Sequence, residues 1–200
     1  MSASEDTTAS TDSANWRYSG GELELPRVTA TQGEDGHNIG KLLATTGTVT
    51  LDHGFVNTAS CTSTITYIDG DAGILRYRGY PIEQLAANSS FVEVSYLLIY
   101  GALPTASELA AFESKLRIHT LLHEDLKNFF DGFPSDAHPM PVLSSAVSAL
   151  STFYQDSLDP FDQDQVDIST IRLLAKVPTI AAYALRKSLG QPLLYPDNDH

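Results

Sequence analysis

The fold is decided around residues 62–82, which have the sequence TSTITYIDGDAGILRYRGYPI. Both ends of this stretch are rich in β-branched and aromatic residues, which favour strands, and DGDAG at 69–73 is a turn sequence. The pattern predicts a β-hairpin with a loop slightly longer than the minimum. The two aspartates of the turn resemble the start of a calcium loop. Because Gly73 and Tyr80 stand where that loop needs later ligands, we interpret the segment as a hairpin turn.

The chain before this hairpin is predicted to be extended. Residues 22–25 and 48–51 alternate between polar and apolar side chains, which is typical of half-buried strands. Residues 1–14 are rich in Ser, Thr and Ala, carry three acidic residues and lack Lys and Arg, unlike signal or transit peptides. We therefore predict a disordered acidic tail over residues 1–19 and a β-rich segment over residues 20–80.

The chain from residue 81 onward is predicted to be helical. Capping-box patterns at 90–93 and 105–108 start two helices, and Gly101 provides a C-terminal cap for the first. Residues 121–130 carry apolar side chains that predict a further helical stretch.

Two more helices are predicted towards the end of the chain. Residues 139–154 have apolar residues on one face and many small residues, which suit either a subunit-contact helix or an ordinary core helix. The last helix is predicted to run from residue 168 to 189, with Asp167 and Gly190 as its caps. Proline removes a backbone donor, so a kink or break is expected at Pro178.

The composition limits the partners that the protein could have. The formal net charge is −13 and the pI is about 4.6, which argues against nucleic acid and anionic membranes as partners. We find no apolar stretch near the roughly 20 residues that span a bilayer. Cys61 is the single cysteine, so no intrachain disulfide can form, and we expect a buried, inert thiol. A cytoplasmic location is predicted from these features.

Two pairs of residues could form ligand sites. His119 and His123 are four apart on a predicted helix and could share a zinc ion, but no third ligand is evident, and helix-surface or capping histidines are the alternative. We therefore assign no metal. Arg172 and Lys176 place two like charges on one helix face, where they are either solvated or bridged by a bound anion.

Six blocks stand out along the chain, namely ITYIDGDAGILRYRGYPI (65–82), HTLLHE (119–124), HPM (138–140), FYQDSLD (153–159), IRLLAKVPT (171–179) and GQPLLYP (190–196). In this order, and over roughly residues 20–198, the chain resembles one enzyme family, the citrate synthases. Within that family it most resembles the longer bacterial form, type II, and its sequence has an actinobacterial character.

This resemblance implies a mostly α-helical fold, here incomplete, with a small β-rich N-terminal segment. Residues 81–200 would form the N-terminal helical part of the family's large domain, truncated at its end. The resemblance also implies a homo-oligomer, either a homodimer or a hexamer.

The resemblance further implies the condensation of acetyl-CoA with oxaloacetate to give citrate and CoA, without a metal or cofactor. The family's catalytic residues lie beyond residue 200, so we assign none here and expect the 200-residue chain alone to be inactive. Two alternatives stay open. One is a 2-methylcitrate synthase that uses propionyl-CoA, and the other is a non-catalytic helical module for subunit contact or nucleotide binding.

Some type II members are inhibited by NADH. The resemblance places this allosteric site at His119, Thr120, Tyr154, Arg172 and Lys176. One position departs from the pattern, because Ile118 stands where an arginine is expected.

Overall fold

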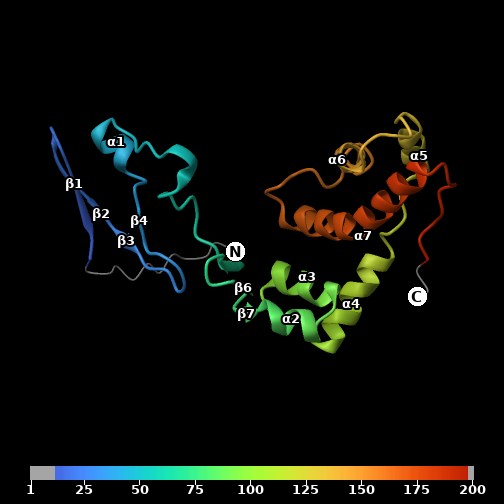
Figure 1. Cartoon of the computed structure of the whole chain (residues 1–200), viewed down its shortest axis with the longest axis horizontal. Helices are drawn as coiled ribbons and strands as arrows, with labels where there is room; N and C mark the ends of the chain where they lie inside the picture. The colour runs from blue at the N-terminus through green and yellow to red at the C-terminus, as the bar shows by residue number, and fades with distance from the viewer. Residues whose placement is uncertain (1–11, 198–200) are drawn as a thin grey trace. The chain divides into compact units, whose positions relative to one another are not determined.

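The structure is a computed structural model that describes residues 12–197 (Figure 1). It contains two compact units. Unit 1 comprises the residues up to Ser90 together with Leu97–Ala102, and unit 2 comprises Phe91–Tyr96 and the residues from Leu103 onward. Residues 1–11 of the predicted tail lie outside the described part of the chain.

Unit 1 is built from small antiparallel sheets and short helices. The hairpin β1–β2, the pair β3–β4 and the three-stranded sheet β5–β6–β7 are its sheets. Their bounds, with those of the helices, are β1 (Ala14–Tyr18), β2 (Gly21–Leu25), β3 (Arg27–Val28), β4 (Gly36–His37), α1 (Leu42–Thr46), the 3-10 helix η1 (His53–Phe55), β5 (Thr66–Asp69), β6 (Ile74–Tyr77), β7 (Tyr80–Pro81) and α2 (Ile82–Asn88).

The predicted central hairpin is confirmed by the pairing of β5 with β6. The side chain of Asp69 accepts a hydrogen bond from the backbone N–H of Ala72 at 2.9 Å, and Gly73 adopts a φ of 68° that favours glycine. Asp69 therefore shapes the turn. In residues 12–197 no cluster of three or more potential metal ligands occurs.

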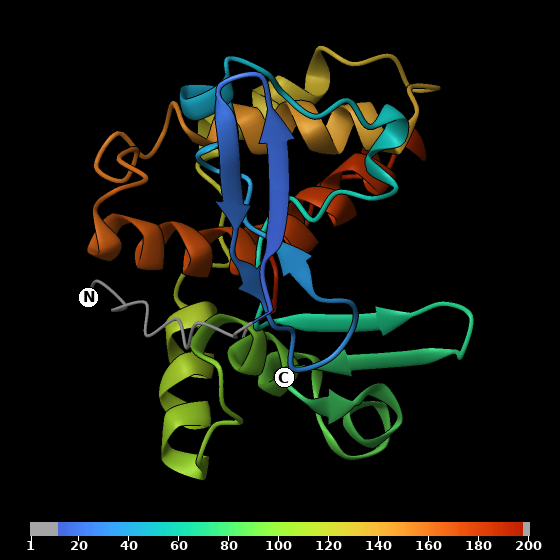
Figure 2. The ribbon, with the colours of Figure 1, turned by 90° about the vertical axis from the view of Figure 1, so that its left-hand side faces the viewer.

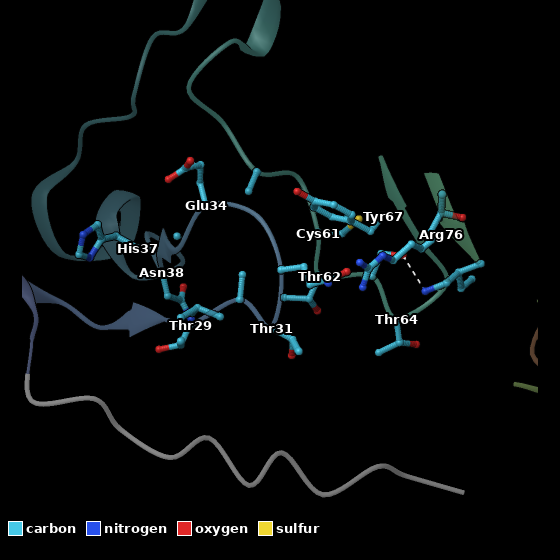
Figure 3. A pocket seen from close by; sticks show the side chains of 18 of the residues that line it. Thr29, Thr31, Glu34, His37, Asn38, Cys61, Thr62, Thr64, Tyr67 and Arg76 are labelled. Carbon is cyan, nitrogen blue, oxygen red and sulfur yellow. Dashed lines mark hydrogen bonds between the residues drawn. The ribbon is translucent and has the colours of Figure 1, made fainter. Parts of the chain in front are cut away.

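Three expectations for unit 1 are wrong. The predicted tail reaches too far, because β1 pairs with β2 across the tight turn after Tyr18. The strand expected at 48–51 does not form, and Leu51 is 83% exposed, because alternation without a partner strand buries nothing. Cys61 is exposed where a buried thiol was expected, and it lines a pocket shown in Figure 3.

Unit 2 is helical. Helix α3 (Phe91–Tyr100) gives its first six residues to this unit. The helices that belong to it entirely are α4 (Ala106–Arg117), α5 (Glu124–Asp131), α6 (Pro139–Leu150) and α7 (Gln163–Ser188). Figure 2 shows α6 lying above α7, and both α5 and α6 pack on α7.

The capping box predicted at residues 105–108 is confirmed, and a histidine caps another helix of unit 2. Thr105 and Glu108 form a reciprocal capping box that starts α4. His138 caps α6, because its Nδ1 accepts a hydrogen bond from the backbone N–H of Met140 at 3.2 Å. The α6 helix ends at Leu150, four residues earlier than predicted.

Helix α7 differs from its prediction at its start. It begins five residues early because Asp162, rather than Asp167, accepts hydrogen bonds from the first backbone N–H groups. The helix continues through Pro178 as one element, so of the kink or break expected there, the break does not occur.

Helix α7 is also long and apolar enough, by length and composition, to cross a membrane, which the sequence analysis did not expect. Ile180, Tyr183 and Ala184 of this helix are buried in the core of unit 2. Its apolar length therefore has an explanation in packing. The core joins residues from α5, α6, α7 and the loop before α5, namely Leu122, Leu126, Phe130, Val142, Ala146, Leu150, Ile180, Tyr183 and Ala184.

We predict that Phe130→Ala destabilises unit 2. Phe130 is fully buried and its ring packs edge-to-face on Tyr183, with 5.9 Å between centroids. Loss of such a ring costs about 3–5 kcal/mol of unfolding free energy. Urea denaturation followed by circular dichroism measures the change. Phe161→Ala is the matched control, because Phe161 is 95% exposed and its loss should cost less than about 0.5 kcal/mol.

Candidate functional site

The candidate site is built around the loop between α4 and α5. Helix α4 ends at Arg117, and Ile118 is its C-cap. His119 lies in the loop, whereas His123 is the N-cap of α5 and accepts a hydrogen bond from the backbone N–H of Asp125 at 3.2 Å. The expectation that both histidines lie on one helix is therefore wrong. The chain leaves the helix after Arg117, and His123 has a capping role.

Helix α7 holds this loop through three consecutive backbone carbonyls. The ammonium of Lys176 donates to the carbonyl of His119 at 2.8 Å and also to that of Leu121. The hydroxyl of Thr179 donates to the carbonyl of Thr120 at 3.0 Å. Residues three apart share a helix face, so both donors point at the loop. Lys176 is only 2% exposed, and the interpretation of Lys176 as a solvated helix charge is therefore wrong.

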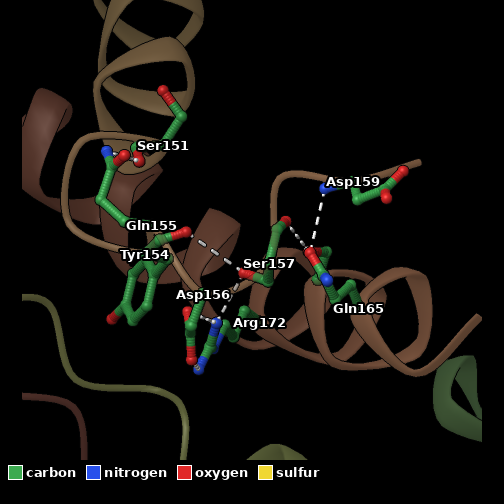
Figure 4. Close-up of polar contacts among 9 residues, drawn as sticks. Ser151, Tyr154, Gln155, Asp156, Ser157, Asp159, Gln165 and Arg172 are labelled. Atoms are coloured by element: carbon green, nitrogen blue, oxygen red, sulfur yellow. Dashed lines mark hydrogen bonds and ion pairs between the residues drawn. The ribbon is translucent and has the colours of Figure 1, made fainter. Parts of the chain in front are cut away.

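Arg172 lies one turn earlier on α7 and forms an ion pair with Asp156 (Figure 4). Its Nη1 and Nη2 donate to the two carboxylate oxygens at 2.9 and 3.1 Å, and Nη1 also donates to the hydroxyl of Ser157 at 2.7 Å. This bidentate contact fixes the guanidinium plane. Its Nε is buried and has no acceptor among the described residues.

The ring of Tyr154 faces both cations of α7. The guanidinium carbon of Arg172 is 4.4 Å from the ring centroid, and the ammonium of Lys176 is 5.3 Å from it. The negative face of an aromatic ring attracts cations at these distances. Tyr154 and Asp156 therefore offset the repulsion between Arg172 and Lys176.

The cations also set the protonation of their neighbours. Burial lowers the pKa of His119 below 6.5, and the charges of Lys176 and Arg172 lower it further. The folded state then binds protons less readily than the unfolded state, so unit 2 is expected to lose stability as the pH falls below about 6.5. The hydrogen bonds from Arg172 lower the pKa of Asp156 and favour its carboxylate.

The structure brings together all five residues that the resemblance assigns to a nucleotide site. His119 and Thr120 come from the loop, Tyr154 follows α6, and Arg172 and Lys176 come from α7. Ile118 is 72% exposed at the end of α4. Asp156, Ser157 and Thr179 were not predicted from the sequence as part of this site. Thr179 could have been predicted, because it is three residues from Lys176 and that spacing places both side chains on one helix face.

Comparison with known proteins identifies the family. A family described as "Citrate synthase, C-terminal domain" matches residues 54–200. Citrate synthase 1 of Mycobacterium tuberculosis is 67% identical over 187 residues, which cover 94% of this chain and 43% of that protein. The citrate synthase of Corynebacterium glutamicum is 57% identical over 181 residues, which cover 90% of this chain and 41% of its own.

A solved structure supports the same assignment. The crystal structure of citrate synthase from Thermotoga maritima is 33% identical, with a TM-score of 0.64, and it matches 76% of this chain and 38% of its own. The chain therefore belongs to a family of acyltransferases, the citrate synthases. The resemblance and the mostly helical fold predicted from the sequence are confirmed. The chain spans less than half the length of the relatives that it matches.

We predict that Lys176→Met loosens the loop between α4 and α5. The variant keeps the length of the side chain but leaves the carbonyls of His119 and Leu121 without this charged donor, which costs about 1.5–3 kcal/mol. Loss of the cation also raises the pKa of His119 towards 6.5, because one of the charges that lowers it is gone. Urea denaturation measures the first effect, and an NMR pH titration of the imidazole measures the second.

Lys115→Met serves as the control for this variant. Lys115 is exposed on α4, so its replacement should change neither quantity. An unchanged pKa of His119 in Lys176→Met would show that the ammonium does not act on the imidazole.

Proposed function

We propose that this protein is a citrate synthase that condenses acetyl-CoA with oxaloacetate to citrate and CoA. The observation that carries the proposal is the 67% identity to Citrate synthase 1 of Mycobacterium tuberculosis over 94% of this chain. The names of the relatives favour acetyl-CoA over the propionyl-CoA of a 2-methylcitrate synthase. A homodimer or hexamer in the cytoplasm is part of the same proposal.

The 200 residues have a structural and regulatory role in this proposal. We assign no catalytic role to any of them and expect the chemistry to need the further length that the relatives have. The described residues would then supply helical scaffold and a regulatory site. The alternative is a non-catalytic module for subunit contact or nucleotide binding.

A chimera tests the proposed activity. The chain replaces the matching region of Citrate synthase 1 from Mycobacterium tuberculosis, and release of CoA from acetyl-CoA is followed with a thiol reagent. We expect turnover that requires oxaloacetate from the chimera, and none from the 200-residue chain. A folded chimera without activity would favour the non-catalytic module. Turnover by the chain alone would contradict the expectation that none of these 200 residues is catalytic.

We also propose that NADH is the regulatory ligand of the site at His119, Thr120, Tyr154, Arg172 and Lys176. The clustering of two cations and an aromatic ring supports a ligand that carries phosphates and flat rings. The ion pair between Arg172 and Asp156 opposes phosphate binding, because the Asp156 carboxylate occupies the guanidinium nitrogens that phosphate oxygens would contact. In this proposal a phosphate displaces Asp156 from Arg172, while Lys176 keeps its hold on the loop.

Two variants of the 200-residue chain should therefore change NADH affinity in opposite directions. Arg172→Ala removes a charge-assisted contact of about 1.5–3 kcal/mol, so we expect at least about tenfold weaker binding. Asp156→Asn removes the competing charge and should tighten binding severalfold. Titration calorimetry at low and high salt measures both, and salt should weaken the unmodified chain's binding.

Lys115→Ala is the control for these variants and should bind NADH as the unmodified chain does. If no saturation appears up to millimolar NADH at low salt, the pair of Arg172 and Asp156 is structural and the regulatory proposal is wrong. Weaker binding by Asp156→Asn would equally contradict the competition between Asp156 and phosphate.

A further inference from the structure

Unit 1 contains a pocket that the proposed function does not use. Its volume is about 920 Å³, which is within the range of small-molecule sites. One wall is the loop between β3 and β4, and the other is formed by residues 61–67 with Arg76 (Figure 3). All of its lining residues belong to unit 1.

The β5–β6 hairpin places Arg76 on the pocket. Tyr67 and Arg76 are directly opposite each other in the antiparallel register, so their side chains lie on the same face of the sheet. Both line the pocket, and Figure 3 shows them beside Cys61 and Thr62. The hairpin thus presents one guanidinium and one aromatic ring side by side.

The opposite wall is held in place by Asp35. Its carboxylate accepts hydrogen bonds from the Nε of Arg27 and the backbone N–H of Ala30, both at 2.7 Å. The hydrogen bond from Ala30, and then the hydrogen bond and charge of Arg27, lower the pKa of Asp35. Gly33 of the same loop has a φ of 90°, and a Cβ there would lie 3.5 Å from the ring of Tyr67. The loop therefore closes against the hairpin at a glycine that a larger residue would strain.

Arg76 differs from the neighbouring arginines because its side chain has no ion-pair or hydrogen-bond partner in the described part of the chain. Arg27 pairs with Asp12 and Asp35, and Arg78 donates to Thr64 and to the carbonyl of Leu98. Over residues 12–197, the side chain of Arg76 forms neither an ion pair nor a hydrogen bond, although the residue is half-buried. The hydroxyl of Thr62, which also lines the pocket, has no protein partner in that range either.

We propose that this pocket binds a small monocarboxylic acid with an apolar body. The planar guanidinium of Arg76 receives the carboxylate in a bidentate contact, and Thr62 adds a hydroxyl donor. Ile39, Ile65 and Tyr67 line the pocket and accommodate the apolar part of the ligand. Glu34 also lines it, and its charge disfavours a ligand with a second negative charge. The proposal concerns unit 1 alone and does not depend on the proposed synthase activity.

The single cysteine makes the test specific for this pocket. Cys61 lines it and is exposed, so the neutral reagent iodoacetamide should alkylate the thiol at a rate that mass spectrometry measures. Benzoate is the probe, benzamide is its neutral equivalent, and phenyl phosphate carries the larger charge. We expect benzoate to slow alkylation of the 200-residue chain in a saturable way, benzamide to leave the rate unchanged, and phenyl phosphate to protect weakly.

Variants then assign the effect to Arg76. Arg76→Gln should raise the benzoate concentration needed for half-maximal protection at least tenfold. The control Arg17→Gln, which replaces an exposed arginine of β1, should leave that concentration unchanged. Glu34→Gln should let phenyl phosphate protect Cys61 more strongly. If circular dichroism shows that Arg76→Gln is unfolded, Thr62→Val replaces it, with an expected threefold loss. Absence of protection, equal protection by benzamide, or protection that survives these changes would overturn the proposal.

Discussion

The candidate site depends on the hydrogen bonds by which α7 holds the loop at residues 119–121. Removing an ammonium group from water is costly unless its donors find acceptors. Lys176 meets that condition with two backbone carbonyls and the ring of Tyr154, while Thr179 donates to the carbonyl between them. Three consecutive carbonyls of the loop after α4 thus accept hydrogen bonds from side chains of one helix.

This arrangement has an electrostatic consequence one turn away on α7. With Lys176 fixed beside the loop, Arg172 is held near a second positive charge and needs a negative partner. Asp156 provides it through both carboxylate oxygens. Because Asp156 is largely exposed and Arg172 is not, the carboxylate is the component that can leave while the guanidinium stays. The ion pair is therefore the natural point at which an anionic ligand and the protein compete.

Local signals in the sequence were sufficient for several elements. The hairpin at β5–β6 and the capping box at Thr105 are specified by residues that are close together in the chain, and both are confirmed. The start of α7 was missed because Asp162 caps a polar stretch without apolar periodicity.

Contacts between residues that are far apart in the sequence could not be predicted from local sequence patterns. No local pattern indicates that Lys176 is buried, because its acceptors are more than 50 residues earlier. The five residues of the candidate site came from the family resemblance, whereas their contacts with Asp156, Ser157 and Thr179 came from the structure. The exposure of Cys61 likewise depends on how a loop packs.

The acidic composition of the chain makes the unpaired side chain of Arg76 more unusual than the paired side chain of Arg172. The chain has 25 acidic residues and only 12 Lys and Arg, so most cations can find a carboxylate at little conformational cost. Arg172 follows this expectation and Arg27 does as well. Arg76 does not, because its strand position places it opposite Tyr67, and Asp35 in the loop between β3 and β4 is already held by Arg27 and Ala30. In an acidic protein, a half-buried arginine kept apart from carboxylates by its own fold has an unmet preference for an oxyanion, and the pocket beside it gives that oxyanion a place to bind.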